Sequence, residues 1–392
     1  MSVAQSPLQI RRWASLTLSL AAVGGPAAAG AQGTEQGAYI VRIGKDTLAA
    51  ERFSRTPTAL RGESVVRSPQ TVVRSYALTF DANGNLLKYE LTARKPGAPP
   101  SSRPLQHAIL TPIGDSLRVE IHTDSARTMM VAAPRGTLPA LNLAYGIYET
   151  AVMRAVKMGK DSVVIPMLFI GSNQTNDIPI KRIGKDSITL AAPFGVSRMR
   201  IDAVGHIMGS ASPGSTQQVT VERVNSVDPQ ALALAFGDRG LGPLSPRDTA
   251  RATVAGTTLL VDYSRPMKRG RVVFGNVVPW DSVWRTGANA ATTFVTSKDI
   301  VLGGTSVPAG TYTLFTLPTQ GAGWKLIISR HTKEWGTDYD PKADLARVDL
   351  KVVTLPAPVE QLTFAIDTQG SGGTLRFSWD ETEARVPFEV KP

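Results

Sequence analysis

The chain has 392 residues, no cysteine, and 43 basic against 32 acidic residues, for a net charge of +11 at neutral pH. The lack of cysteine excludes disulfide bonds, thiolate metal sites and a lipid-modified N-terminal cysteine. The basic residues are spread singly, with no Lys/Arg block and no basic stripe between aromatic residues, so we expect a solvated basic surface and no nucleic-acid partner.

Residues 1–31 have the features of a cleavable signal peptide. Two arginines, Arg11 and Arg12, precede an apolar run over 13–23, and Ala-Gly-Ala at 29–31 fits a cleavage site. The arginine pair leaves a twin-arginine signal as an alternative to the general secretory route. The apolar run is shorter than the roughly 20 residues that span a bilayer. We therefore expect an exported protein, periplasmic or extracellular after cleavage near Ala31, with no membrane-spanning segment.

Residues 32–225 are predicted to form one β-rich domain. Segments in this region alternate in polarity, and in 72–80 the side chains of Tyr76, Leu78 and Phe80 share one face. A period of two is typical of strands with one buried and one exposed face. We expect a mainly β fold, with a curved antiparallel sheet here. Turns built from Gly, Asp and Ser are predicted at residues 44–47, 114–116, 159–162 and 184–187.

The segment 139–158 breaks the strand pattern and predicts one helix packed against this sheet. Pro139 suits a first helical position, and Gly159 suits the residue after the end. Its apolar residues recur at spacings of three and four and form one stripe: Leu141, Tyr145, Tyr148, Val152 and Val156.

Residues 226–250 are predicted to be a linker, because Gly and Pro interrupt them repeatedly. Residues 251–392 then form a second domain of short strands and turns. The segment 347–352 alternates in polarity, and a Gly-rich tip at 370–373 joins two strands. About eight short strands, with no helical pattern, favour a β-sandwich of jelly-roll type.

The second domain contains five motifs: YSRP at 263–266, RGR at 269–271, VWRTGANAAT at 283–292, PAGTYTL at 308–314 and VEQLTF at 359–364. Together they resemble the DUF2911 family over roughly residues 244–392. DUF2911 is a domain of unknown function found in exported bacterial proteins. The resemblance therefore implies a domain boundary and an exported location but no activity. Many members carry Glu where this chain has Ala290.

The first domain is similar, in pattern and not in motif, to periplasmic half-barrel domains that wrap one helix. Some of these carry lipids or the acyl chains of lipoproteins. The resemblance is an analogy of fold, and it places an acyl chain among the candidate ligands.

A cluster of arginine and aromatic residues is the first candidate ligand site. Arginine forks suit carboxylates and phosphates, and tryptophan faces suit sugars or cations. In the structural alternative, Trp284 fills the sandwich core and Arg285 pairs with a carboxylate such as Asp281 or Glu360. The candidate residues are Arg265, Arg269, Arg271, Trp280, Trp284, Arg285 and Asn289.

A loop over residues 330–340 is the second candidate ligand site. Trp335 and Tyr339 in this loop either form an exposed aromatic rim that contacts a ligand or pack the loop over a sheet edge. Trp324 and His331 complete this second candidate site.

No metal or cofactor site is predicted. The four histidines, His107, His122, His206 and His331, are scattered singly, and none lies in an HxH or HExxH pattern. The sequence also lacks a G-x-S-x-G elbow, a P-loop and a dinucleotide fingerprint.

We expect a non-catalytic binding or envelope-associated protein whose ligand is a glycan, an acidic peptide or an acyl chain. One alternative is a hydrolase that acts on an envelope polymer through carboxylates such as Asp262, Asp281 or Glu360. That hypothesis requires an open cleft with two carboxyl groups about 5–10 Å apart. Another alternative is a scaffold for protein partners, which requires an exposed apolar patch.

Overall fold

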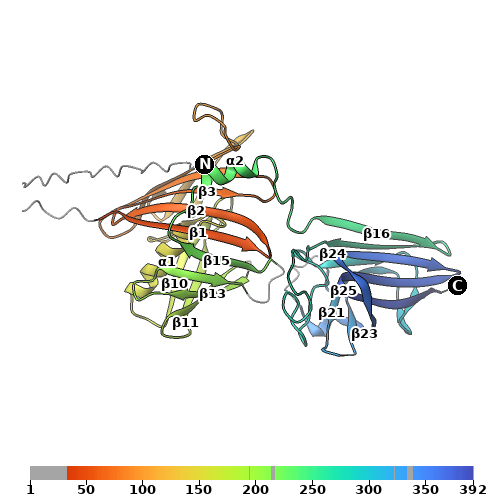
Figure 1. The fold of residues 1–392 in the computed structure, drawn as a ribbon. Coiled ribbons are helices and arrows are strands. Elements are labelled where there is room, and N and C mark those ends of the chain that lie inside the picture. Colours follow the sequence, from red (N-terminus) through yellow and green to blue (C-terminus); the bar gives the residue numbers. More distant parts are fainter. Residues whose placement is uncertain (1–32, 194, 213–216, 322, 333–338, 392) are drawn as a thin grey trace, which may run out of the picture. The chain divides into compact units, whose positions relative to one another are not determined.

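The N-terminal part of the chain forms one large curved sheet, shown in red to green in Figure 1. The computed structural model describes residues 33–193, 195–212, 217–321, 323–332 and 339–391. The predicted signal peptide and Trp335 lie outside these residues. Within them the large sheet has 15 strands, which the next paragraph gives in spatial order.

The strands follow one another along the chain except at the centre of the sheet, where β1 pairs with β15. All neighbours are antiparallel except β9 and β10, which are parallel. The spatial order is β8 (Ala126–Ala132), β7 (Ser116–His122), β6 (Gln106–Ile113), β5 (Leu86–Arg94), β4 (Val72–Phe80), β3 (Ala59–Val66), β2 (Asp46–Thr56), β1 (Glu35–Ile43), β15 (Val219–Val224), β14 (Ile207–Ala211), β13 (Gly195–Ile201), β12 (Ser187–Ala192), β11 (Asn176–Arg182), β10 (Ser162–Phe169) and β9 (Leu138–Ala140).

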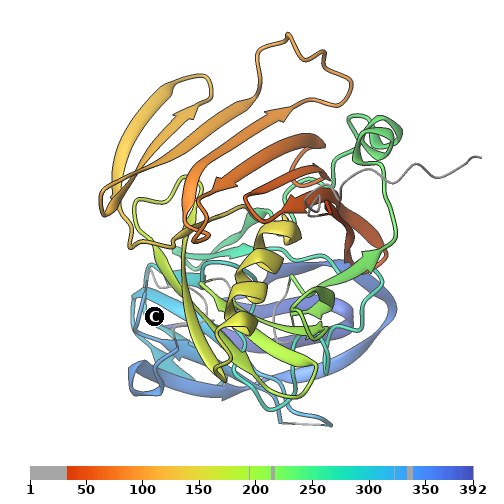
Figure 2. The same cartoon turned by 90° about the vertical axis from the view of Figure 1, so that its left-hand side faces the viewer.

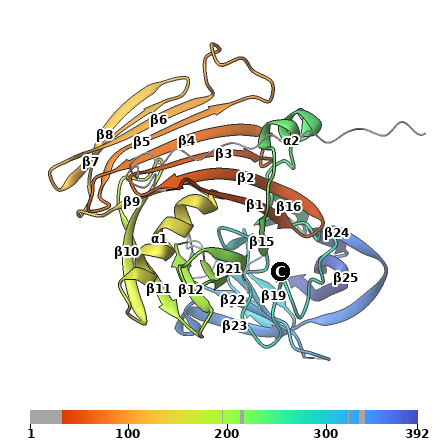
Figure 3. The same cartoon turned by 60° about the vertical axis from the view of Figure 1, so that its left-hand side comes forward.

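The predicted alternation of buried and exposed residues is present in these strands. In β4, the side chains of Tyr76, Leu78 and Phe80 are buried in one core together with residues from the neighbouring strands. This core fills the hollow of the curved sheet, where helix α1 (Tyr145–Lys157) also lies (Figures 2 and 3). The expected curved antiparallel sheet with one packed helix is thus confirmed.

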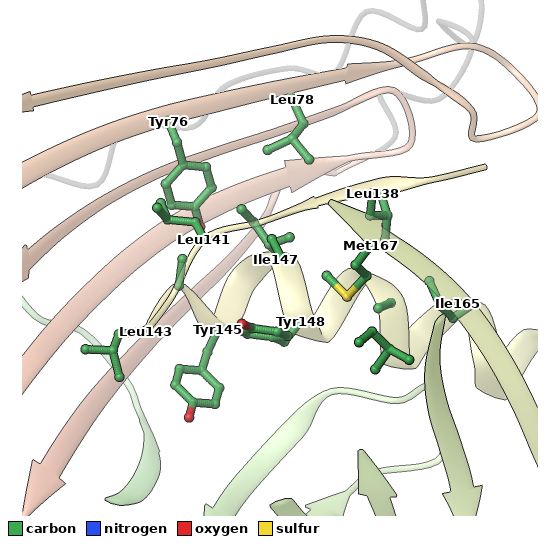
Figure 4. Packing of buried hydrophobic residues seen from close by; sticks show 14 of the residues in the cluster. Tyr76, Leu78, Leu138, Leu141, Leu143, Tyr145, Ile147, Tyr148, Ile165 and Met167 are labelled. Carbon is green, nitrogen blue, oxygen red and sulfur yellow. The ribbon is translucent and has the colours of Figure 1, made fainter. Parts of the chain in front are cut away.

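Helix α1 is shorter than the predicted segment 139–158. Pro139 lies in β9, at the edge of the sheet, where the missing N–H of proline does not interrupt a ladder. The predicted stripe still faces the core, and Figure 4 shows Tyr145 and Tyr148 of the helix among buried side chains from the strands. Within the described residues, no helix combines the length and the apolar character needed to cross a membrane.

The N-terminus of α1 is capped by the sheet. The N-cap residue, Ala144, provides no side-chain cap. Instead the fully buried carboxylate of Glu51, on β2, accepts hydrogen bonds from the main-chain N–H groups of Tyr145 and Gly146, at 2.6 and 3.1 Å. Its other oxygen accepts a hydrogen bond from the hydroxyl of Tyr76. One carboxylate therefore satisfies two of the free N–H groups of the helix and fixes the helix on the sheet.

The C-terminal part of the chain forms a β-sandwich. Within the part that the structure describes, a sheet of six strands and a sheet of four strands share one apolar core, which includes Phe294 from the first and Trp379 from the second. The six-stranded sheet has the order β16 (Arg247–Val254), β17 (Thr257–Ser264), β18 (Thr292–Thr296), β21 (Gly310–Leu317), β22 (Lys325–Ser329) and β23 (Asp344–Asp349). The four-stranded sheet has the order β20 (Thr305–Val307), β19 (Ile300–Leu302), β25 (Gly372–Val390) and β24 (Lys351–Gln369).

The predicted linker, 226–250, contains regular structure. Helix α2 (Pro229–Phe236) begins with Asp228 as its N-cap and buries Ala233 against Ala50 and Val65 of the large sheet. The first strand of the sandwich, β16, begins at Arg247, inside the predicted linker. The division into two domains, with these boundaries, stays a prediction, because residues 34–392 form one compact unit.

The buried Glu51 predicts a pH-dependent stability. Burial raises the pKa of this carboxyl from 4.5 to about 7, because three hydrogen bonds only partly offset the loss of solvent. The folded protein therefore holds a proton that the unfolded chain releases above pH 4.5. The contribution of Glu51 to the free energy of unfolding is fully present below that pH. It is lost as the pH rises through about 7, by about 3 kcal/mol in total.

Urea unfolding followed by circular dichroism between pH 4 and 8 measures this dependence. The Glu51→Gln variant should lose most of it, because the amide does not titrate. The control is Glu222→Gln, which changes an exposed glutamate on β15 and should keep the wild-type profile. Parallel profiles for the wild type and Glu51→Gln would contradict the assignment.

Candidate functional site

Trp284, the central residue of the first predicted site, belongs to the sandwich core. Its side chain is 6% exposed, and its indole N–H donates to the carbonyl of Gly287 at 3.1 Å. The ring stacks on Trp379, with 6.0 Å between ring centroids, and meets Phe377 edge-on at 5.9 Å. This placement matches the structural alternative for Trp284.

The arginines of the motif bind main-chain oxygens more than carboxylates. Arg271 donates from Nε to the carbonyl of Lys268 and from Nη2 to that of Met267. Arg285 donates to the carbonyl of Asn289 at 2.9 Å, and not to the expected Asp281 or Glu360. Asn289 itself has a left-handed main chain, with φ of 59°. These contacts give hydrogen-bond partners to carbonyls in a region between β17 and β18 that has little regular structure.

Two further arginines tie this region to neighbouring strands. Arg265 donates to the carbonyl of Leu362 at 2.9 Å and forms an ion pair with Asp248 at 2.8 Å. The main-chain N–H of Arg269 donates to the carboxylate of Glu360 at 2.8 Å. Each of these contacts stabilises the loop. The role of these residues in ligand binding stays a prediction.

The described aromatic members of the two predicted sites pack against other aromatic residues. Trp280 is half-buried and packs on Phe274 and Trp324, with centroid distances of 6.2 and 6.0 Å. The Tyr339 hydroxyl donates to Asp344 at 2.8 Å, and its ring packs on Phe315. The sequence analysis assigned Trp280 and Trp324 to different sites, whereas the structure places both in one aromatic cluster.

Two of the three carboxylates of the hydrolase hypothesis are engaged in local contacts. Asp262 forms an ion pair with Arg247 at 2.8 Å, and Glu360 accepts the N–H of Arg269. Asp281 is exposed at a turn with a left-handed main chain. No observation brings two of these groups into a cleft.

A pocket with an apolar lining lies instead in the N-terminal part, beside the C-terminal half of α1. Its volume is about 560 Å³, within the range of small-molecule sites. Buried side chains pack between the helix and the sheet, and the pocket is lined by residues of the helix and of nearby turns. The lining residues are Arg55, Thr56, Pro57, Phe80, Gly84, Thr150, Met153, Arg154, Val156, Lys157, Ala203 and Val204.

The turn between β13 and β14 forms one wall of the pocket. Asp202 accepts hydrogen bonds from the N–H groups of Val204, Gly205 and His206 at 2.9–3.0 Å, which fixes the turn. Gly205 has φ of 102°, and a Cβ there would lie 2.9 Å from Cα of Met153. Only glycine allows this close approach of the turn to the helix.

A buried ionic network fixes the helix beside the pocket. Glu149 of α1 is fully buried and pairs with Arg55 at 3.0 Å, with Arg223 and with the hydroxyl of Tyr39. Burial and the neighbouring Glu149 raise the pKa of Tyr39, which therefore stays protonated and donates. The positive charge of Arg55 is also shared with Glu35 at 3.3 Å, so Arg55 brings little free charge to the pocket.

Two other cations at the pocket have no such partner. Arg154 donates to the carbonyls of Gly84, at 2.5 Å, and Gly136, and its guanidinium lies over the ring of Phe80. Lys157 is exposed. Within the described residues, neither cation has a carboxylate within 4 Å. Burial lowers the pKa of Arg154, and the charge of Asp81 offsets this shift only in part. The pocket thus combines an apolar lining with two cations that form no direct ion pair.

Sequence reasoning did not find this pocket. Its residues come from α1 and from turns far apart in the chain, and none belongs to a motif. The alternation of strands predicted Phe80 as a core residue, but nothing local relates it to Lys157 or Val204.

Residues 245–388 match the family model described as "Protein of unknown function (DUF2911)". This match confirms the resemblance inferred from the motifs of the C-terminal domain. A comparison with curated proteins finds no match.

Among solved structures, the chain is similar to a β-barrel-like DUF1849 protein from Brucella abortus, at 8% identity over 50% of this chain and 98% of that chain, with a TM-score of 0.35. It is also similar to a DUF1089 family protein from Pseudomonas aeruginosa, at 12% identity over 42% of this chain and 89% of that chain, with a TM-score of 0.31. At these scores neither likeness supports an inference about fold or function.

The packing of Trp284 predicts a structural role for the motif. Trp284→Ala should destabilise the sandwich by about 3–5 kcal/mol, because a buried indole is replaced by a cavity. Arg285→Ala should cost about 1 kcal/mol, the value of one hydrogen bond. Urea unfolding of both variants measures these losses.

The matched control is Val283→Ala, which changes an apolar neighbour that is 36% exposed and should cost far less. A Trp284→Ala variant as stable as this control would show that the indole does not hold the core.

Proposed function

We propose that the protein is a non-catalytic binding module for an amphiphile with an apolar chain and an anionic head group, and that it acts after export. The observation that carries this proposal is the pocket beside α1, where Phe80, Met153 and Val156 line a volume of about 560 Å³ and the cations Arg154 and Lys157 form no direct ion pair. An apolar chain gains about 0.8 kcal/mol for each methylene group that it buries.

The same observation favours an acyl chain over the other two predicted ligand classes. A glycan requires several polar groups around its hydroxyls, whereas the polar side chains here are mainly Arg55, Arg154 and Lys157 with two threonines. An acidic peptide would use the cations but would leave the apolar lining unfilled. A carboxylate or phosphate head group paired with Lys157 and Arg154 uses both features.

Thermal shift and calorimetry with dodecanoate, below its micellar concentration, test the proposal. A ligand at a hundred times its dissociation constant stabilises the protein by roughly 2.7 kcal/mol. Dodecanol, with the same chain and no charge, should bind more weakly. Val204→Trp should remove binding of both, because Val204 is 54% exposed at the pocket and an indole there fills it at little cost in folding.

The head-group contact is tested by reversing charge. Lys157→Glu should weaken dodecanoate binding at least tenfold and leave dodecanol binding within about twofold. The matched control is Lys160→Glu, which makes the same charge change at an exposed position outside the pocket. Equal losses in the two lysine variants, or full binding by Val204→Trp, would reject the pocket as the binding site.

A further inference from the structure

Two histidines that are 15 positions apart in the sequence face each other on the large sheet. His107 of β6 and His122 of β7 are paired in register, and the ring centroids lie 6.1 Å apart with an angle of 29° between the ring planes. Their strand neighbours Ala108 and Ile121 are buried in the core. Because side chains alternate along a strand, both histidines lie on the opposite, solvent-facing side of the sheet.

The orientation of His107 is fixed by a carboxylate. Nε2 of His107 lies 3.0 Å from Oε1 of Glu90, on the adjacent strand β5. A carboxylate on one ring nitrogen holds the histidine in the tautomer whose other nitrogen is a free electron-pair donor, which is how metal-binding histidines are commonly supported. Nδ1 of His107 is that donor.

His122 completes a pair of ligands. It is exposed and, within the described residues, its side chain forms no hydrogen bond or ion pair. Both rings line a pocket of about 380 Å³ together with Asp124 and Arg103. The guanidinium of Arg103 donates to the carbonyl of Thr123 at 2.6 Å.

We propose that His107 and His122 bind one divalent late first-row transition metal ion, Cu²⁺ most tightly. Imidazole nitrogen is a preferred ligand of Cu²⁺, Ni²⁺ and Zn²⁺, and the Irving–Williams order favours Cu²⁺. The described residues contain no group of three or more His, Asp or Glu placed to hold a metal, so water completes the coordination shell. The site is independent of the proposed amphiphile pocket, with which it shares no residue.

Calorimetric titration of tag-free protein with CuCl₂ and with ZnCl₂ tests the site. The wild type should bind one Cu²⁺ more tightly than Zn²⁺. His107→Gln and His122→Gln should each weaken Cu²⁺ binding at least tenfold, and the double variant should remove it. His331→Gln, which changes an exposed histidine of the sandwich, is the control and should bind as the wild type does.

Two readouts distinguish a built site from a surface histidine. Electron paramagnetic resonance of the Cu²⁺ complex should show two nitrogen ligands in the wild type and one in each single variant. Glu90→Gln keeps both ligands, and should weaken binding about tenfold through loss of the support to His107. Unchanged affinity in either histidine variant, or a spectrum with one nitrogen in the wild type, would overturn the proposal.

Discussion

The N-terminal part depends on two carboxylates buried between helix α1 and the sheet. Glu51 projects from the sheet and accepts the free N–H groups at the start of the helix, while Glu149 projects from the helix and pairs with Arg55 and Arg223 of the sheet. A buried charge is costly unless it is paired and hydrogen-bonded. Both carboxyl groups have their hydrogen-bond and ion-pair partners only when the helix occupies this one position. They therefore specify where the helix packs on the sheet.

The pocket follows from that constraint. Met153, Arg154 and Lys157 line it because the first turns of the helix are held by Glu51 and the middle by Glu149. Gly205 then allows the turn between β13 and β14 to reach the helix and provide the remaining wall. The proposed binding surface therefore results from the way in which a polar network fixes one helix.

The sequence predicts the elements of this fold better than its sites. Polarity alternation and the stripe on α1 are local signals, and they led to the mainly β fold and the helix. The start of the helix was misplaced because its cap, Glu51, lies on a distant strand, and the expected Pro139 signal belongs to the edge strand β9. Arg285 donates to a main-chain carbonyl and not to a carboxylate, a choice that residue types alone do not reveal.

The histidine pair was within reach of sequence reasoning. The turn predicted at residues 114–116 joins β6 to β7, and the register that places Ile113 opposite Ser116 also places His107 opposite His122. The sequence analysis considered the four histidines one by one and so did not predict that the hairpin pairs two of them. The amphiphile pocket, in contrast, required the closed arrangement of helix, sheet and turn, which no single local pattern encodes.

The pairing of β1 with β15 has a consequence for biosynthesis. Every other neighbour in the large sheet is close along the chain, so β2 to β8 and β9 to β14 can pair as soon as that part of the chain is free to fold. The central seam, where Ala38 meets Val224, must wait until nearly the whole sheet has been made. During that interval β1 already has one partner in β2, while its other edge is open, which makes it the strand on which a nascent chain is most exposed to wrong pairing.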